Sequence, residues 1–456
     1  MSGSLLWYVG AFAVALGVLI VVHELGHYVA ARLVGVKVLR FSVGFGKPLL
    51  TRRFGADGTE WSLAAFPLGG YVKMLDEREA QVAEDELHRA FNRQSVGRRS
   101  LIVLAGPVAN LLLAIILYAF MFVHGITEMR PVLGAPEAGT AAAEAGIEEG
   151  EVVNAVSGTP VASLQEFRWQ LMKRIVDEQP VELTTTDSQG RTHVRALDAH
   201  ATDADALDAD FTRRLGLVPY HPKLAAVVGA VAPDSIAAQA GIEPDDLVTH
   251  ANGIAIGDWM QLATKIRESP GNPMALVIVR HGVPHELTLV PKAETEGGKT
   301  VGRIGIGVRD DPAARAALFV EVRLAPVDAV GRAVTQTWDI SVFSLRMIGR
   351  MIIGKQSWKN VSGPVTIADY AGQSARLGLD HYLQFLALIS ISLGVLNLLP
   401  IPILDGGHLL YHLLEAVKGS PLSERAMEIG QQVGAGLLVL LMAFAFYNDI
   451  NRLISG

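Results

Sequence analysis

The residues best suited to chemistry form a short motif near the N-terminus. His23, Glu24 and His27 match the pattern His-Glu-x-x-His. On a helix, a spacing of four residues brings both imidazoles to one face, where they can bind the same Zn²⁺ ion. Glu24 is then placed to take a proton from a water molecule that the metal activates. The motif predicts a zinc hydrolase.

A catalytic zinc ion needs a third protein ligand and one open position. Because the chain has no cysteine, histidine or a carboxylate must supply that ligand. The candidate is Asp405, an isolated acid that ends the apolar segment Asn397-Leu-Leu-Pro-Ile-Pro-Ile-Leu-Asp405 and precedes two glycines. Proline and glycine predict irregular backbone here, which a membrane tolerates where it lines a polar cavity. His408 and His412 are expected beside the site or at an interface.

The elements that must position these residues are predicted membrane helices, since half of the 456 residues are apolar. The first apolar segment, residues 5–22, is long enough to cross a membrane if its helix continues through the zinc motif to residue 33. A signal peptide is the alternative, but a basic start and a clear cleavage site are missing. Further spans are predicted at residues 101–123, 382–404 and 433–447.

The charges predict how these spans are oriented. Twelve lysines and arginines lie between Arg32 and Arg99, so the loop between the first two spans is expected in the cytoplasm. Residues 125–325 carry 28 acidic and 18 basic residues, a net charge of −10. This acidic block and both termini are then expected outside, which in a bacterium is the periplasm. The chain shows no strongly basic patch that would indicate a nucleic-acid partner.

The acidic block contains an internal repeat. Residues 139–154 and 234–249 both run from small residues through Ala-Gly-Ile to an acidic turn and an apolar strand. Each copy continues into a predicted helix and a further strand. The pair resembles tandem PDZ domains, small α+β or β-sandwich modules whose groove accepts an extended peptide. Generic soluble domains without a binding role are the alternative, and the pattern leaves open whether the grooves bind peptide or exclude bulky proteins.

With its two motifs, His-Glu-Leu-Gly-His and Asn-Leu-Leu-Pro-Ile-Pro-Ile-Leu-Asp-Gly-Gly, the chain resembles the site-2 protease family over nearly its whole length. The resemblance implies His23, His27 and Asp405 as zinc ligands, Glu24 as general acid and base, and Asn397 as a substrate contact. It also covers a signature at residues 106–110, interpreted as a site of close helix packing. The implied substrates are trimmed single-span membrane proteins: an anti-sigma factor of an envelope-stress pathway and remnant signal peptides.

Two further segments are predicted to handle the substrate. Residues 37–74 contain strand-like stretches, and the resemblance implies a membrane-associated β-hairpin that pairs with extended substrate; a loop on the membrane surface is the alternative. Residues 338–359 mix apolar residues with Arg346, Arg350 and Lys355. This pattern predicts an amphipathic helix on the outer membrane surface or a packed helix that gates substrate entry.

The predicted fold is a multi-pass α-helical membrane protein of the bacterial inner membrane, with four spans, two periplasmic PDZ-like domains, a membrane-associated hairpin and an active site toward the cytoplasmic side. A non-catalytic zinc-containing scaffold or receptor is the alternative function, although Glu24 and an open fourth metal position argue against it. The expected boundaries are 1–36 (first span with the zinc motif), 37–99 (cytoplasmic loop with the hairpin), 100–124 (second span), 125–221 and 222–310 (PDZ-like domains), 311–375 (linker and amphipathic surface helices), 376–418 (third span with the Asp-Gly motif) and 419–456 (fourth span and C-terminus).

Overall fold

The computed structural model describes residues 2–198, 211–296, 299–354 and 363–455, and the chain divides into two units. The first unit comprises Met1–Ile126 and Arg323–Ser455, and the second comprises Thr127–Val322. The first unit contains the helices α1 (Ser2–Leu33), α2 (Val96–His124), α9 (Pro326–Ile352), α10 (Pro364–Leu377), α11 (Leu379–Asn397), α12 (Asp405–Lys418) and α13 (Glu424–Ser455), the strands β1 (Val38–Phe54) and β2 (Thr59–Met74), and two short 3₁₀ turns, Glu84–Arg89 and Phe91–Arg93.

Four helices in the described residues are long and apolar enough to cross a membrane, as predicted: α1, α2, α11 and α13. The third predicted span, residues 382–404, differs from its helix, because α11 ends at Asn397 and not at residue 404. Pro400 and Pro402 follow within five residues, and a proline lacks the N–H group that a continuing helix needs. The chain instead forms a turn and starts a new helix, α12, at Asp405. The fourth helix, α13, extends beyond residues 433–447 at both ends.

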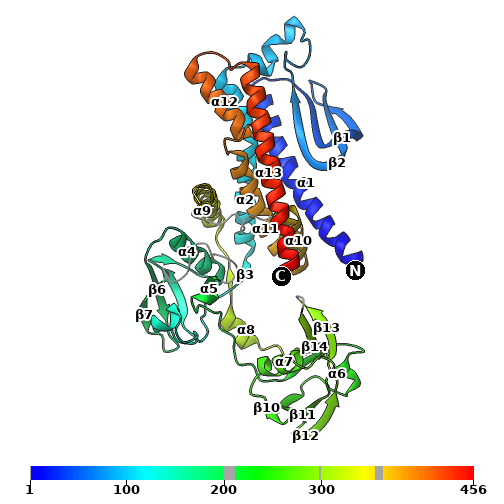
Figure 1. The fold of residues 1–456 in the computed structure, drawn as a ribbon, viewed down its shortest axis with the longest axis vertical. Helices are drawn as coiled ribbons and strands as arrows, with labels where there is room; N and C mark the ends of the chain where they lie inside the picture. The colour runs from blue at the N-terminus through cyan, green and yellow to red at the C-terminus, as the bar shows by residue number, and fades with distance from the viewer. Residues whose placement is uncertain (1, 199–210, 297–298, 355–362, 456) are drawn as a thin grey trace. The chain divides into compact units, whose positions relative to one another are not determined.

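Helix α2 packs against α1, α9, α11 and α12, and so lies at the centre of the first unit (Figure 1). Small residues allow its closest approach to α1. A Cβ atom on Gly26 would lie 2.3 Å from the backbone oxygen of Ala105. On the α11 side, the Ser390 hydroxyl donates a hydrogen bond to the backbone oxygen of Asn110 at 2.7 Å. Close backbone contact of this kind is typical of helix packing in membranes.

Helix α9 covers part of the segment in which an amphipathic helix was predicted. Its buried residues recur along one face, at Ala329, Ala333, Thr337 and Ile340, and the helix contacts α2 and α11. Figure 1 shows α9 end-on while α2 is seen from the side, so α9 lies across the bundle. The predicted helix extended to residue 359, but residues 355–359 lie outside the described part of the chain. A location on the membrane surface stays a prediction.

The last helix is tied to α10 by one buried carboxylate. Asp449 of α13, with 2 % of its surface exposed, accepts hydrogen bonds from the backbone N–H groups of Gly363, Val365 and Thr366 at 2.9, 2.9 and 3.3 Å. The Thr366 hydroxyl donates a fourth at 2.6 Å. These backbone donors belong to the start of α10, where a helix has N–H groups without partners of its own. The side chain of Asp449 therefore caps a helix that is distant in sequence.

The strands β1 and β2 form a doubled hairpin. Residues 40–43 pair on one side with residues 70–73 and on the other with residues 60–63, and residues 48–54 pair with residues 59–64. Both strands therefore bend back on themselves, with Gly44 and Gly69 in the left-handed region at φ values of 90° and 119°. Aromatic rings fix the hairpin on α1: the ring centroids of Tyr28 and Trp61 are 5.2 Å apart, and those of Phe41 and Trp61 are 4.4 Å apart.

The second unit contains two modules with the same sheet order. The first sheet has the order β5-β4-β6-β7, the second has the order β10-β9-β11-β12, and each has a helix between its short edge strand and the next strand (Figure 1). Each module has its own apolar core. The first comprises α3 (Ala141–Glu144), β4 (Val152–Val156), β5 (Thr159–Pro160), α4 (Leu164–Val176), β6 (Val181–Thr186), β7 (Thr192–Leu197) and α5 (Phe211–Arg214). The second comprises β8 (Val228–Val231), α6 (Ile236–Gln239), β9 (Leu247–Ala251), β10 (Ile254–Ala255), α7 (Trp259–Arg267), β11 (Met274–Arg280), β12 (Val283–Leu289), β13 (Lys292–Glu296), β14 (Lys299–Arg303) and β15 (Ile306–Val308).

Three smaller two-stranded sheets complete the second unit: β13 pairs with β14, β15 with β8, and β3 (Ile126–Met129) with β16 (Phe319–Val322). A short helix, α8 (Pro312–Leu318), precedes β16. The pairing of β3 with β16 brings together the two ends of the inserted segment, residues 127–322.

A buried carboxylate occupies the same position in both modules. Glu151 and Asp246 are each 1 % exposed at the side chain and pair with Arg195 at 2.6 Å and with Arg280 at 2.8 Å. Each also accepts a hydrogen bond from the backbone N–H group three residues earlier, at 3.3 and 2.8 Å. Burial works against the ionisation of Asp246, but the hydrogen bonds from Arg280 and the backbone outweigh it and hold its pKa below the usual range.

Candidate metal centre

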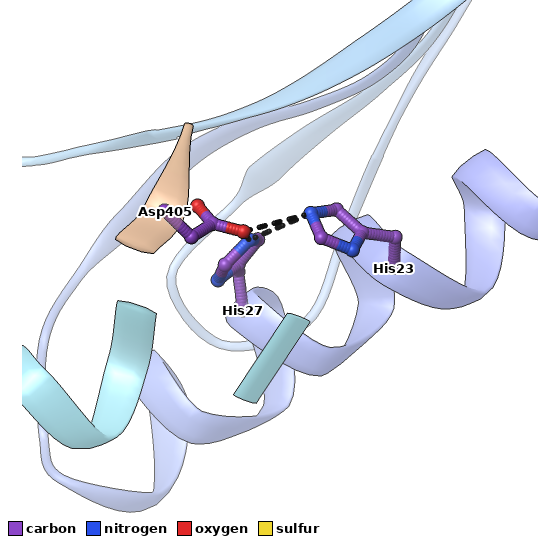
Figure 2. Close-up of side chains that lie close together, drawn as sticks. All are labelled: His23, His27 and Asp405. Carbon is purple, nitrogen blue, oxygen red and sulfur yellow. Dashed lines mark hydrogen bonds and ion pairs between the residues drawn. The ribbon is translucent and has the colours of Figure 1, made fainter. Parts of the chain in front are cut away.

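Two imidazoles and one carboxylate converge in the first unit. His23 Nε2 lies 3.1 Å from Asp405 Oδ2, and His27 Nε2 lies 3.5 Å from the same oxygen. The two Nε2 atoms are 3.3 Å apart. Figure 2 shows both rings projecting from α1 toward the carboxylate, which comes from the first residue of α12. The side chains are largely buried, with 12 % of each histidine and 18 % of Asp405 exposed.

Helix α2 holds the outer nitrogen atom of each ring. His27 Nδ1 lies 2.8 Å from the backbone oxygen of Ile102. A carbonyl oxygen can only accept a hydrogen bond, so His27 Nδ1 carries the proton, and the Nε2 atom of a neutral ring keeps its lone pair. His23 Nδ1 lies 3.2 Å from the side-chain amide of Asn110. Ile102 and Asn110 are eight residues apart on α2, and therefore lie on the same face.

Gly106 lies between these two residues and leaves room for the rings. A Cβ atom there would lie 2.3 Å from His27 Nε2 and 2.9 Å from His23 Cε1. Both values are well below ordinary van der Waals contact, so a side chain at this position would displace the imidazoles. The face of α2 from Ile102 to Asn110 is thus shaped to the two histidines.

The three converging atoms fit a zinc ion. Zinc binds histidine nitrogen and carboxylate oxygen at about 2.0–2.2 Å, and the ligand atoms of a tetrahedron with such bonds are roughly 3.3–3.5 Å apart. The observed separations are 3.1, 3.3 and 3.5 Å. Apart from the two imidazoles, Asp405 Oδ2 is buried without a hydrogen-bond partner in the described residues. The donor set of two histidines and one carboxylate is one that catalytic zinc sites use, with the fourth position left open.

Glu24 lies between this cluster and the β1–β2 hairpin. It follows His23 directly on α1, and its side chain packs against β2. A Cβ atom on Gly70 would lie 2.9 Å from Glu24 Cγ, 2.8 Å from the backbone oxygen of Ser42 and 3.0 Å from Ile20 Cγ2. The absence of a side chain at residue 70 therefore allows the hairpin to approach the helix at the position of Glu24.

The glycines after Asp405 are part of α12 and allow its first turn to pack tightly. A Cβ atom on Gly406 would lie 2.1 Å from the backbone oxygen of Leu399, and one on Gly407 would lie 2.4 Å from that of Ile401. The irregular backbone predicted around Asp405 is therefore confined to the residues before it, 398–404. As the first residue of a helix, Asp405 also lies where the helix dipole stabilises a negative charge.

The remaining candidates do not belong to the cluster. His408 and His412 follow on α12, and neither belongs to the group of potential metal ligands found in the described residues. His412 Nδ1 lies 3.2 Å from the Ser100 hydroxyl of α2. Asn397 is the last residue of α11 and is half-buried. The structure thus brings His23, His27 and Asp405 together, and Asn397 lies at the end of the preceding helix.

The support that α2 gives to the histidines was not predicted. Residues 106–110 were interpreted only as a helix-packing motif. The signal was present in the spacing, because Gly106 and Asn110 are four residues apart and share a helix face with Ile102. What the sequence could not show is that this face is turned toward the zinc motif, and that one of the hydrogen bonds uses a backbone carbonyl.

Comparisons with known proteins match the chain to a peptidase family and to several relatives. The family model for peptidase family M50 matches residues 11–441. A Neisseria meningitidis protein whose name describes it as a zinc metalloprotease is 44 % identical over 445 residues, covering 97 % of this chain and 99 % of its own. The regulator of sigma-E protease RseP of Escherichia coli is 42 % identical over 451 residues, covering 99 % and 100 %. Protease RseP of Yersinia pestis is 40 % identical over 451 residues with the same coverage.

Proposed function

The chain belongs to peptidase family M50 and is an intramembrane zinc metalloprotease of the site-2 type, which acts in regulated intramembrane proteolysis, and on that premise we propose that His23, His27 and Asp405 bind its zinc ion and that Glu24 is its general base and acid. The observation that carries this proposal is the convergence of three ligand atoms from α1 and α12 at separations that fit tetrahedral zinc.

The proton transfers fall to Glu24. A bound zinc ion supplies Lewis acidity, which polarises a peptide carbonyl and acidifies water. Glu24 takes the proton of the attacking water as the oxygen bonds to the carbonyl carbon. It then delivers that proton to the amide nitrogen as the C–N bond breaks. Glu24 follows His23 on α1, and its Cγ atom lies against Gly70, so the side chain starts next to both the proposed ligands and the hairpin.

Substrate would enter as an added strand beside Glu24. A transmembrane helix hides its peptide bonds within its own hydrogen bonds, so the cleaved segment must first be extended. Residues 70–74 pair with residues 38–43 on one side, and the pairings described leave their other edge free. Extended peptides bind free strand edges through backbone hydrogen bonds. Gly70 places this edge against Glu24, and Asn397 would contact the substrate from the end of α11.

The substrates proposed are single-span membrane proteins that another protease has already trimmed, namely an anti-sigma factor and remnant signal peptides. The two modules of the second unit are proposed to be periplasmic PDZ-like domains that hinder untrimmed proteins. Support comes from their shared sheet order and from a relative named as a regulator of sigma-E protease. The basic residues between the first two spans favour the inner membrane with this loop in the cytoplasm and both termini in the periplasm.

A Glu24→Gln variant tests the mechanism. The amide keeps the size of the side chain but cannot accept the proton, so cleavage of a single-span model substrate should fall by roughly 100-fold or more. The zinc content of the purified protein should stay unchanged. Glu268→Gln is the matched control, since that glutamate is 61 % exposed and pairs with Lys265 of α7, in the second module of the second unit. Unimpaired cleavage by the Glu24→Gln protein would reject the assigned role.

A further inference from the structure

Asn110 is a fully buried polar residue within hydrogen-bond distance of His23, and the proposed function does not yet assign a role to its amide. We propose that Asn110 is a positioning residue for His23: its side-chain carbonyl accepts the Nδ1 proton of the ring and so leaves Nε2 free to bind zinc. This inference rests on the proposed function, because it assumes that His23 is a ligand. It concerns how the ligand is prepared and not which residues bind the ion.

A neutral imidazole carries a single proton on one of its two nitrogen atoms. A ring that binds zinc through Nε2 must carry that proton on Nδ1, and a buried N–H group needs an acceptor. For His27 the acceptor is the backbone oxygen of Ile102 at 2.8 Å. For His23 the polar group within reach of Nδ1 is the Asn110 amide at 3.2 Å. A hydrogen-bond acceptor for the ring nitrogen that does not bind the metal commonly fixes the orientation and the proton position of a metal-binding histidine.

The amide of Asn110 can present either of its ends to the ring. With Nδ2 toward His23, Nδ1 has to accept, and the ring proton lies on Nε2, which faces Asp405 Oδ2 at 3.1 Å. A half-turn of the amide brings Oδ1 to the same place, so that Nδ1 donates and Nε2 keeps its lone pair. Oδ1 is buried and has no hydrogen-bond partner in the described residues. Within the described residues, the half-turn therefore breaks no hydrogen bond of Oδ1.

The surroundings make this amide difficult to replace by water. Asn110 has 0 % of its surface exposed, and its backbone oxygen accepts the hydrogen bond from Ser390 of α11. The residue is therefore held from both sides, by α1 through the side chain and by α11 through the backbone. Loss of its amide would leave His23 Nδ1 without an acceptor, and the ring proton would then compete with zinc for Nε2.

Three variants separate this role from simple packing. Asn110→Leu keeps the approximate size but removes the acceptor, and should weaken zinc binding about 10- to 100-fold. Asn110→Asp keeps an oxygen toward Nδ1, so its zinc affinity should not fall more than about threefold below that of wild type. Ser390→Ala removes the neighbouring hydrogen bond to the same residue without touching His23, and should also stay within about threefold.

The experiment measures the zinc dissociation constant of the full-length protein in detergent, by competition with a chelator, for wild type, the three variants and Asp405→Ala. Weak binding by Asn110→Leu, with tight binding by Asn110→Asp and Ser390→Ala, is the expected result. Wild-type affinity of Asn110→Leu, or equal losses in Asn110→Leu and Ser390→Ala, would overturn the inference. If Asp405→Ala instead binds zinc as tightly as wild type, the proposed function itself fails.

Discussion

The substitution Gly106→Ala adds one methyl group directly against His27 and His23, the proposed metal ligands. The new Cβ atom would lie 2.3 Å from His27 Nε2, whereas comfortable contact needs about 3.5 Å. The ring would have to move by about 1.2 Å, several times the roughly 0.2 Å tolerance of a zinc–ligand distance. Helix α2 cannot easily retreat, since a Cβ atom on Gly394 of α11 would lie only 3.1 Å from the Pro107 backbone oxygen.

We therefore expect Gly106→Ala to lower zinc affinity at least about 100-fold and to abolish cleavage, while the helices stay folded. The assay is zinc content and chelator competition on the purified protein, with circular dichroism as the test of folding. Gly97→Ala is the matched control on the same helix, because its Cβ atom would meet nothing within 4 Å. Zinc binding by Gly106→Ala at the level of Gly97→Ala would refute the view that this glycine makes room for the ligands.

Three further predictions address other contacts. Gly70→Ala should push against Glu24 Cγ, 2.9 Å from the new Cβ atom, and slow cleavage about 10-fold or more with zinc retained; unchanged turnover would contradict the contact. The pKa of Asp246 is lowered in the folded protein. The ionised carboxylate therefore stabilises the fold fully above the unfolded pKa of about 3.9, and this contribution is lost as pH falls through the lower pKa of the folded protein. Hydrogen exchange in β9 and β11 should rise over that acid range in wild type but not in Asp246→Asn. The same pH dependence of exchange in both proteins would show that Asp246 is not the group responsible. Glu243→Gln, at a glutamate that is 62 % exposed, is the control. Asp449→Ala should leave the capped amides of α10 unpaired and destabilise the protein by about 3 kcal/mol; unaltered exchange protection at these amides would argue against the cap.

The sequence predicted which side chains converge better than it predicted what supports them. His23 and His27 could be paired from helical spacing, and Asp405 from its isolation after an apolar run. Such arguments work because a charged side chain within a membrane is costly and rarely accidental. The support from Ile102 and Gly106 could not be read in the same way, since one contributes a backbone oxygen and the other an absent side chain.

The boundaries of helices and strands could also be predicted only in part. Pro400 and Pro402 indicated that the third span would break, but the pattern could not show that the helix already ends at Asn397. The hairpin was expected between residues 37 and 74, yet its doubling depends on bends at Gly44 and Gly69, whose backbone angles follow from tertiary contacts. Likewise, the shared sheet order of the two modules matches the repeat, whereas the arginine partners of Glu151 and Asp246 come from different strands, β7 and β11.

The separation of the proposed zinc ligands along the chain has a consequence for biosynthesis. The ribosome makes His27 early, and Asp405 emerges 378 residues later, which at about 5–20 residues per second is a delay of roughly 20–75 s. During that interval the nascent chain has a histidine pair in the membrane but lacks the carboxylate that completes the ligand set. A peptidase assembled in this order has no complete set of these three side chains until its last helices have been made.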